Sequence, residues 1–243
     1  SMQQGNVIEK NNTLIDRRFL RLEYAKQEIL RQLYALGMKQ DKLWEKKGFS
    51  LRAKTLQDLR VATIMDTFTL TCFQPECQIF ELTPLKWLVE MKNAQPDILF
   101  LESAWRGKDQ LWRNKIVDYS TELYDLVTYC HKQKIPVIFW CKEDPPHTDR
   151  FMHVAYLADI VFTTDIDAVE IYKRELGHNF VYHLHFAAQP QIHNPLELHE
   201  RKDRFAFAGR YPKKYPDRLR VFDELSDFFI RSRRSEEHTS ELQ

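Results

Sequence analysis

The segment Pro136-Val-Ile-Phe-Trp-Cys-Lys-Glu-Asp-Pro-Pro-His147 decides the fold class of this 243-residue chain. Its first five residues, Pro136–Trp140, form a short apolar run, which predicts a buried strand. The residues from Lys142 onward are polar and are stiffened by two prolines, which is typical of a loop. In a parallel sheet, ligands collect at such loops, beyond the carboxyl ends of the strands. The segment therefore predicts both a buried strand and a candidate site.

Apolar, β-branched or aromatic runs of the same kind recur along the chain, at Leu59–Met65, Ile98–Leu101, Ile160–Phe162, Phe180–Leu184 and Phe205–Ala208. Several spacers between them have helical periodicity, namely Pro84–Ala94, Tyr119–Gln133 and Asp165–Leu176. Thr164 precedes Asp167 by three residues, which predicts a capping box, and Gly177 is placed to end that helix. The pattern predicts an α/β fold, with a doubly wound, mostly parallel, Rossmann-like sheet.

An N-terminal helical extension is predicted over residues 1–58. Apolar positions recur at three- and four-residue steps between Thr13 and Leu36, as an amphipathic helix requires: Leu22, Ala25, Ile29, Leu33 and Leu36. Gly37 supplies a stop. Two such stripes could pair and form a homo-oligomer through this helix. Because the stripe is short, packing onto the chain's own domain is favoured.

Three further regions follow from composition. Residues 59–203 form the Rossmann-like domain and end in a proline-containing polar linker from Ala187 to Asp203. Residues 204–233 begin a second domain. Residues 234–243 are polar, lack periodicity and resemble the translation of a common sequencing-library adapter, so we interpret them as a non-native tail; a genuine disordered tail is the alternative.

Charge and cysteine usage exclude several classes of protein. Lys plus Arg number 36 and Asp plus Glu number 35, so no overall field favours nucleic acid as a partner. The four cysteines lack CxxC spacing, which indicates reduced thiols and a cytoplasmic location. No apolar stretch approaches the ~20 residues that cross a bilayer, so any membrane association is expected to be peripheral. Neither GxGxxG nor GxxxxGK[ST] occurs, and His183-x-His185 lacks further ligands at metal-site spacing, so we expect neither cofactor nor metal.

The loop Lys142–His147 is the richest in groups that could transfer protons. Glu143, Asp144 and His147 are candidate catalytic residues there, and Lys142 is a candidate substrate-binding cation. An equally weighted alternative is a turn in which Asp144 or Thr148 caps the next helix and Glu143 pairs with Lys142. Residue chemistry alone leaves both open.

Other strand ends supply further candidates. Asp66 follows the first strand and is a candidate catalytic carboxylate, and the loop from Glu102 to Gly107 follows the second. In that loop, Trp105 and Arg106 offer an aromatic face and a cation to a sugar or phosphate. Thr164 and Asp165 are further candidates for substrate binding. Beyond the last strand, three residues before a helix suit a diphosphate at the helix N-terminus, with a tight turn as the alternative: Gly209, Arg210 and Tyr211.

At these loops the chain resembles the CgeB-like spore-maturation glycosyltransferases, a bacterial group with GT-B architecture. The resemblance covers about Leu59–Arg218 and rests on six motifs in order: Leu101-Glu-Ser-Ala-Trp-Arg-Gly107, Trp140-Cys-Lys-Glu-Asp-Pro-Pro-His147, Val161-Phe-Thr-Thr-Asp165, Phe186-Ala-Ala-Gln-Pro190, His193-Asn-Pro195 and Phe207-Ala-Gly-Arg-Tyr211.

The resemblance implies transfer of a sugar from a nucleotide-diphosphate donor to a cell-surface polysaccharide, teichoic-acid-like polymer or spore-coat acceptor, without an obligatory metal. Residues 59–203 would then be the acceptor side, and residues 204–233 a truncated start of the nucleotide-sugar domain. Such a fragment is expected to lack activity by itself, because half a cleft cannot orient both substrates. The alternative interpretation is a non-catalytic α/β module that binds a glycan or nucleotide.

Overall fold

The computed structural model describes residues 49, 52–193, 205–207, 216–225 and 229–231. The chain divides into two compact units, residues 1–193 and residues 194–243. The predicted N-terminal helix with its stop at Gly37, most of the predicted linker and the predicted tail lie outside the described residues. Each unit is described by itself.

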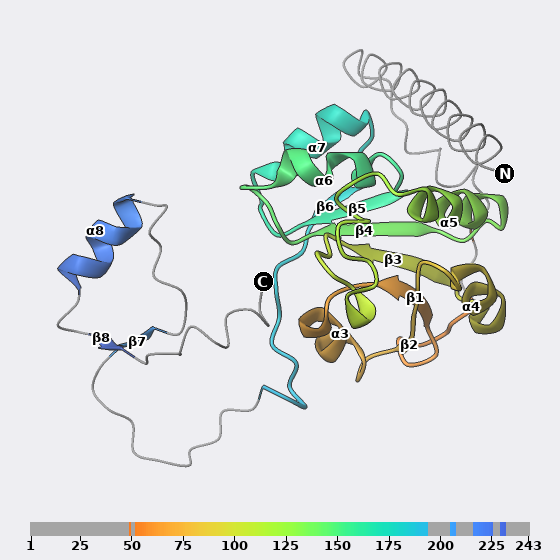
Figure 1. Cartoon of the computed structure of the whole chain (residues 1–243), viewed down its shortest axis with the longest axis horizontal. Coiled ribbons are helices and arrows are strands. Elements are labelled where there is room, and N and C mark those ends of the chain that lie inside the picture. The colour runs from red at the N-terminus through yellow and green to blue at the C-terminus, as the bar shows by residue number, and fades with distance from the viewer. Residues whose placement is uncertain (1–48, 50–51, 194–204, 208–215, 226–228, 232–243) are drawn as a thin grey trace, which may run out of the picture. The chain divides into compact units, whose positions relative to one another are not determined.

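The first unit contains a six-stranded sheet in which every pairing is parallel. Its strands are β1 (Arg60–Ile64), β2 (Gln78–Glu81), β3 (Ile98–Glu102), β4 (Val137–Cys141), β5 (Ile160–Thr163) and β6 (Val181–His183). Their spatial order is β2-β1-β3-β4-β5-β6 (Figure 1). The predicted α/β fold with a Rossmann-like parallel sheet is confirmed. The edge strand β2 was not predicted.

Helices connect the strands. They are α3 (Thr67–Phe73), α4 (Trp87–Ala94), α5 (Thr121–Lys132), α6 (Thr148–Ala155) and α7 (Ala168–Leu176), and a short 3₁₀ helix, η1 (Lys108–Gln110), follows β3. Residues of α4, α5, α6 and α7 share one apolar core with the sheet, whereas α3 contributes to a second core. The helices therefore cover the two sheet faces unequally.

Alternation along β3 separates the two cores. Leu99 and Leu101 belong to the larger core, and Ile98 and Phe100 to the smaller one, because successive side chains of a strand point to opposite faces. All five residues of β3 are buried. A strand buried on both faces reads as a continuous apolar run, which is why sequence pattern predicted β3 well.

The predicted capping box at the start of α7 is wrong. The helix begins at Ala168, its N-cap is Asp167, and no side chain caps it. Asp165 instead forms a turn, because its Oδ1 accepts the backbone N–H of Asp167 at 3.1 Å. The predicted end of the helix is confirmed, since Gly177 has φ +68° and a left-handed conformation that suits glycine.

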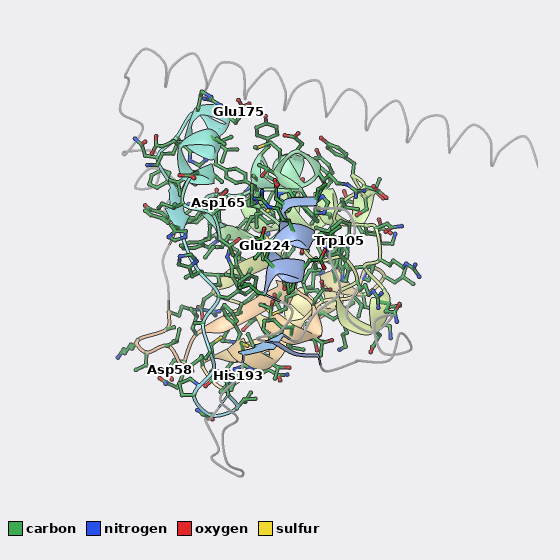
Figure 2. All side chains as sticks on the ribbon, turned by 90° about the vertical axis from the view of Figure 1, so that its left-hand side faces the viewer. Asp58, Trp105, Asp165, Glu175, His193 and Glu224 are labelled. Atoms are coloured by element: carbon green, nitrogen blue, oxygen red, sulfur yellow. The ribbon has the colours of Figure 1, made fainter. Side chains whose placement is uncertain are left out.

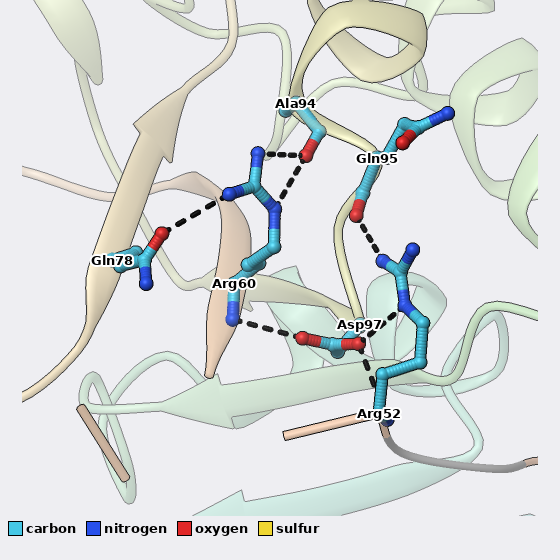
Figure 3. A network of polar contacts seen from close by, with 6 residues as sticks. All are labelled: Arg52, Arg60, Gln78, Ala94, Gln95 and Asp97. Carbon is cyan, nitrogen blue, oxygen red and sulfur yellow. Dashed lines mark hydrogen bonds and ion pairs between the residues drawn. The ribbon is translucent and has the colours of Figure 1, made fainter. Parts of the chain in front are cut away.

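A polar network fixes the amino-terminal edge of the sheet (Figure 3). The carboxylate of Asp97 accepts the backbone N–H of Arg60 at 3.0 Å and the Nε–H of Arg52 at 3.0 Å. The guanidinium of Arg60 donates to the carbonyl of Ala94 and to Gln78. Burial alone would raise the pKa of Asp97, but the hydrogen bonds from Arg60 and Arg52 outweigh it and lower the pKa.

The second unit contains the strands β7 (Phe205–Phe207) and β8 (Phe229–Arg231), which pair in parallel, and the intervening helix α8 (Pro216–Glu224). This is a strand–helix–strand unit, as a second α/β domain would begin. In neither unit does the described part of the chain contain a helix that is both long and apolar enough to cross a membrane.

Candidate functional site

The carboxyl ends of all six parallel strands of the first unit meet at one edge of the sheet. Along the chain, β2 lies on one side of β1 and β3 on the other, so the strand order reverses between β1 and β3. Ligands of open α/β sheets bind outside the carboxyl ends at such a reversal. Asp66 follows β1, and the segment from Ser103 to Gly107 follows β3. The predicted loops after β1 and after β3 therefore both lie where the strand order reverses.

Asp66 organises the loop after β3. Its Oδ2 accepts the backbone N–H of Trp105 at 3.0 Å, and its Oδ1 accepts those of Arg106 at 3.1 Å and Gly107 at 2.8 Å. Gly107 has φ +62°, and a Cβ there would lie 2.9 Å from side-chain atoms of Trp112. The loop therefore requires glycine at this position. Both oxygens of Asp66 are engaged by the chain, which gives this predicted catalytic residue a positioning role in the structure.

Glu102 and Lys142 form a buried ion pair beneath this loop. The Glu102 carboxylate is fully buried, accepts the backbone N–H of Asp66 at 3.0 Å and contacts the ammonium of Lys142. Burial raises the pKa of Glu102, and the positive charge of Lys142 opposes that rise. The Lys142 Nζ also lies 3.8 Å from the Oδ2 of Asp66. The pairing of Lys142 with Glu143, one of the sequence alternatives, is wrong.

Asp144 ties four elements together. One oxygen of its carboxylate accepts the Thr148 hydroxyl at 2.7 Å and the Tyr172 hydroxyl at 3.2 Å, and the other accepts the Thr163 hydroxyl at 2.6 Å. The Cys141 thiol also donates to it, at 3.2 Å. Burial, reinforced by the charge of Asp144, raises the pKa of Cys141 to about 12. These donors come from β4, α6, β5 and α7, so the structure makes Asp144 an anchor between elements.

The helix cap proposed as an alternative for this loop is wrong in its detail. Residue His147, not Asp144 or Thr148, is the N-cap of α6, and no side chain caps the helix. The Thr148 hydroxyl points back to Asp144 and to the carbonyl of Pro145. The loop is therefore held by hydrogen bonds between its own residues and Thr148, and His147 lies at its end.

The four ionisable residues of the Lys142–His147 loop are all partly exposed, and Glu143 and His147 differ from Lys142 and Asp144 in their partners. Among the described residues, no hydrogen bond or ion pair engages the carboxylate of Glu143. The ring of His147 meets the edge of Trp105, with centroids 5.6 Å apart and planes at 84°. Glu143 is thus a carboxylate of this edge that the described residues leave available.

Trp105 is the centre of an aromatic and cationic surface. The guanidinium of Arg150 lies 5.3 Å from the Trp105 ring centroid, and Phe151 meets the same ring at 5.5 Å. Arg150 is exposed, and sequence reasoning missed it because its position on α6, one turn from His147, is visible only once the helix is placed. We name Trp105, His147 and Arg150 the Trp105 surface.

The remaining predicted residues are spread more widely. Thr164 and Asp165 follow β5, the neighbour of β4. Figure 2 shows Asp165 and Trp105 on the ribbon of the first unit. The Thr164 carbonyl is 3.3 Å from His183 Nε2, and the side chain of Asp165 is used in its own turn. The predicted donor residues Gly209, Arg210 and Tyr211 lie outside the described residues. Within the described ranges, no three His, Cys, Asp or Glu side chains gather as metal ligands.

Fold and site define a class: a parallel α/β domain with ionisable and aromatic side chains at the reversal of its strand order. No known family model matches the chain, and no solved structure matches it. Among characterised proteins, the chain is similar to the spore protein CgeB of Bacillus subtilis (strain 168), with 29% identity over 168 residues. The match covers 68% of this chain and 47% of that protein, so the chain spans about half the length of this relative.

Proposed function

We propose that the first unit is the acceptor-side half of a glycosyltransferase that moves a sugar from a nucleotide-diphosphate donor. The observation that carries the proposal is the available carboxylate of Glu143, whose backbone carbonyl accepts the N–H of His147 in the Trp105 surface, at the edge where α/β sheets bind ligands. The similarity to CgeB supports it, together with the motifs of the CgeB-like glycosyltransferases. A spore-coat or other cell-surface polymer as acceptor is what the resemblance to the CgeB-like glycosyltransferases implies.

In this proposal Glu143 is the general base. Its carboxylate takes the proton of the acceptor hydroxyl as that oxygen attacks the anomeric carbon, and the nucleoside diphosphate leaves with the electron pair of the broken bond. Asp66, Glu102 and Asp144 are less suited to this step, because their carboxylates are held by partners within the chain. They position the loops instead.

The Trp105 surface would hold the acceptor. An aromatic ring suits the apolar face of a sugar, and an exposed guanidinium suits the phosphates of a teichoic-acid-like polymer. Arg150 already lies over the Trp105 ring, so one acceptor unit could meet both groups. This arrangement favours an anionic polymer over a neutral glycan.

Titration of the chain with polyglycerol phosphate, with a neutral oligosaccharide and with nucleotide sugars tests this assignment by calorimetry. We expect binding of polyglycerol phosphate, weakened about tenfold, or by ~1.4 kcal/mol, in Trp105→Ala and in Arg150→Ala. Arg174→Ala, which removes a guanidinium that is exposed on α7, is the matched control and should bind normally. Binding of nucleotide sugars alone, unaffected by Trp105→Ala, would contradict the acceptor role and favour a nucleotide-binding module.

A further inference from the structure

The sheet of the first unit has one face that the described helices cover only in part. The larger core buries its face under α4, α5, α6 and α7, whereas α3 is the only helix in the described part of the first unit that packs on the smaller core. All-parallel sheets are normally covered on both faces. We therefore expect a further segment or ligand to pack against the uncovered part of the second face.

An apolar groove of about 570 Å³ lies on this second face. Its floor is formed by the strands, through residues such as Phe100, Ile138, Trp140 and Phe162, and α3 forms one wall. Large apolar side chains at its rim remain exposed: Leu56 by 53%, Phe68 by 55% and Phe186 by 51%. Exposed apolar side chains that gather around one groove mark an interaction surface.

A strap that follows β6, Leu184–Pro190, also lines the groove. The carbonyl of Leu184 accepts the indole N–H of Trp140 at 3.1 Å. The side-chain amide of Gln189 donates to the carbonyl of Cys72 at 2.9 Å and to the carboxylate of Glu76 at 2.8 Å. These bonds fix the strap to the sheet and to α3, so the groove is a shaped, anchored surface.

We propose that the amphipathic N-terminal segment Thr13–Leu36 docks in this groove and completes the cover of the sheet. Its apolar positions, from Leu22 to Leu36, would span about 21 Å as a helix, and a five-residue strand spans about 17 Å, so the two surfaces match in length. The segment carries the one-sided apolar stripe that such a groove needs.

The course of the chain supports this occupant over a separate partner. Leu56 and Leu59, immediately before β1, themselves line the groove, so the chain enters the sheet beside it. Residues 37–55 can extend to about 60 Å, which is ample for the segment to fold back. A tether of this kind gives an effective concentration in the millimolar range, which favours docking within one chain over docking between chains.

Two native thiols report on the groove. Cys72 and Cys77 line it and are partly exposed. Cys130 and Cys141 are buried, and burial raises the pKa of both thiols, to about 12 for Cys141. Burial, reinforced by the charge of Glu76, also raises the pKa of Cys77, so it is exposure that distinguishes the two groove thiols. A thiol reagent applied to the folded chain reaches Cys72 and Cys77 before the buried pair, and a docked segment would shield them.

The test compares two doubly substituted chains with the unaltered one. Ile29→Asp with Leu33→Asp places two charges on the apolar stripe, and Gln27→Asp with Tyr34→Asp places the same two charges on the opposite helix face. We expect the stripe variant to react at Cys72 and Cys77 at least about tenfold faster, because docking is lost, and the control to react like the parent. Equal rates in all three chains would overturn the proposal.

A second measurement keeps the proposal testable if the stripe variant unfolds. In Leu33→Cys, a short bis-maleimide should link residue 33 to Cys72 or Cys77 within one chain, as peptide mass spectrometry would show. Links found only between isotopically distinct chains would assign the groove to a second copy and overturn the proposal. A third measurement adds dodecanoate, a simple apolar ligand, and follows the reaction of Cys72. If dodecanoate protects Cys72 equally in the parent and in the stripe variant, the groove binds an apolar ligand instead of the segment, and the proposal is overturned.

Discussion

At the scale of single residues, Asp66 connects two strand ends through three backbone hydrogen bonds. Asp66→Asn keeps the size of the side chain but removes its charge and one acceptor oxygen. Because hydrogen bonds to charged groups are worth about 1.5–3 kcal/mol each, we expect the free energy of unfolding to fall by about 2–3 kcal/mol. Urea unfolding measures it. Asp149→Asn, at an exposed position of α6, is the control and should change stability by no more than about 0.5 kcal/mol. An equal effect of the two substitutions would contradict the positioning role of Asp66.

Lys142 neutralises the buried carboxylate of Glu102. In Lys142→Met the carboxylate keeps its burial but loses its cation, so we expect a loss of about 3–5 kcal/mol in the free energy of unfolding. The double variant Glu102→Gln with Lys142→Met should recover much of this loss, since no buried charge remains. A double variant as unstable as the sum of both single variants would show that the two residues act independently.

The same pair predicts a pH dependence. The folded-state pKa of Glu102 is raised, and loss of Lys142 removes the group that opposes this rise. A carboxyl whose pKa is higher in the folded state costs stability once the pH exceeds its unfolded value of about 4.3. The deficit of Lys142→Met relative to the parent should therefore grow as pH rises from about 4 toward neutral. A deficit that shrinks over this range would contradict the ion pair.

At the scale of secondary structure elements, Asp97 joins the start of β1 to the start of β3. Its folded pKa is lowered, so its contribution to stability is present above the unfolded value of about 3.9 and is lost as pH falls through the folded value. Asp97→Asn should lower the thermal unfolding midpoint at pH 7, and the difference from the parent should vanish in strong acid. A difference that persists unchanged at low pH would contradict this origin.

Sequence pattern predicted the buried strands better than the other elements. The run Ile98–Leu101 is apolar throughout because β3 is central, whereas the edge strand β2 reads Gln-Ile-Phe-Glu and is only partly buried. Helix α3, with the sequence Thr-Phe-Thr-Leu-Thr-Cys-Phe, is rich in residues that favour strands, so propensity concealed it. Tertiary packing, and not the intrinsic propensity of these residues, makes this segment a helix.

The loops of the site could be located from sequence, but their pairings could not. Asp66, Trp105, Lys142 and Glu143 were named because they follow apolar runs in a parallel sheet. That Lys142 pairs with Glu102 depends on β3 and β4 being neighbours, which the strand order alone reveals. The engagement of Asp144 with Thr163 and Tyr172 likewise joins a loop, the strand β5 and the helix α7.

At the scale of the whole molecule, sugar transfer needs a donor site and an acceptor site. The first unit supplies the acceptor side in our proposal, and the second unit contains a strand–helix–strand arrangement in its described residues. The relative CgeB is about twice as long as the region matched here. The catalytic claim is therefore best tested in a full-length relative, at the residue that aligns with Glu143.

The most direct test is the rate of sugar transfer by that relative after Glu143→Gln. Because general-base catalysis contributes about 10²–10⁴-fold, we expect kcat to fall by at least about 100-fold, with donor and acceptor KM and the unfolding midpoint little changed. Asp144→Asn should instead lower the unfolding midpoint, and Asp149→Asn should leave both properties intact. A Glu143→Gln enzyme that turns over at the rate of its parent would contradict the proposed function of this edge.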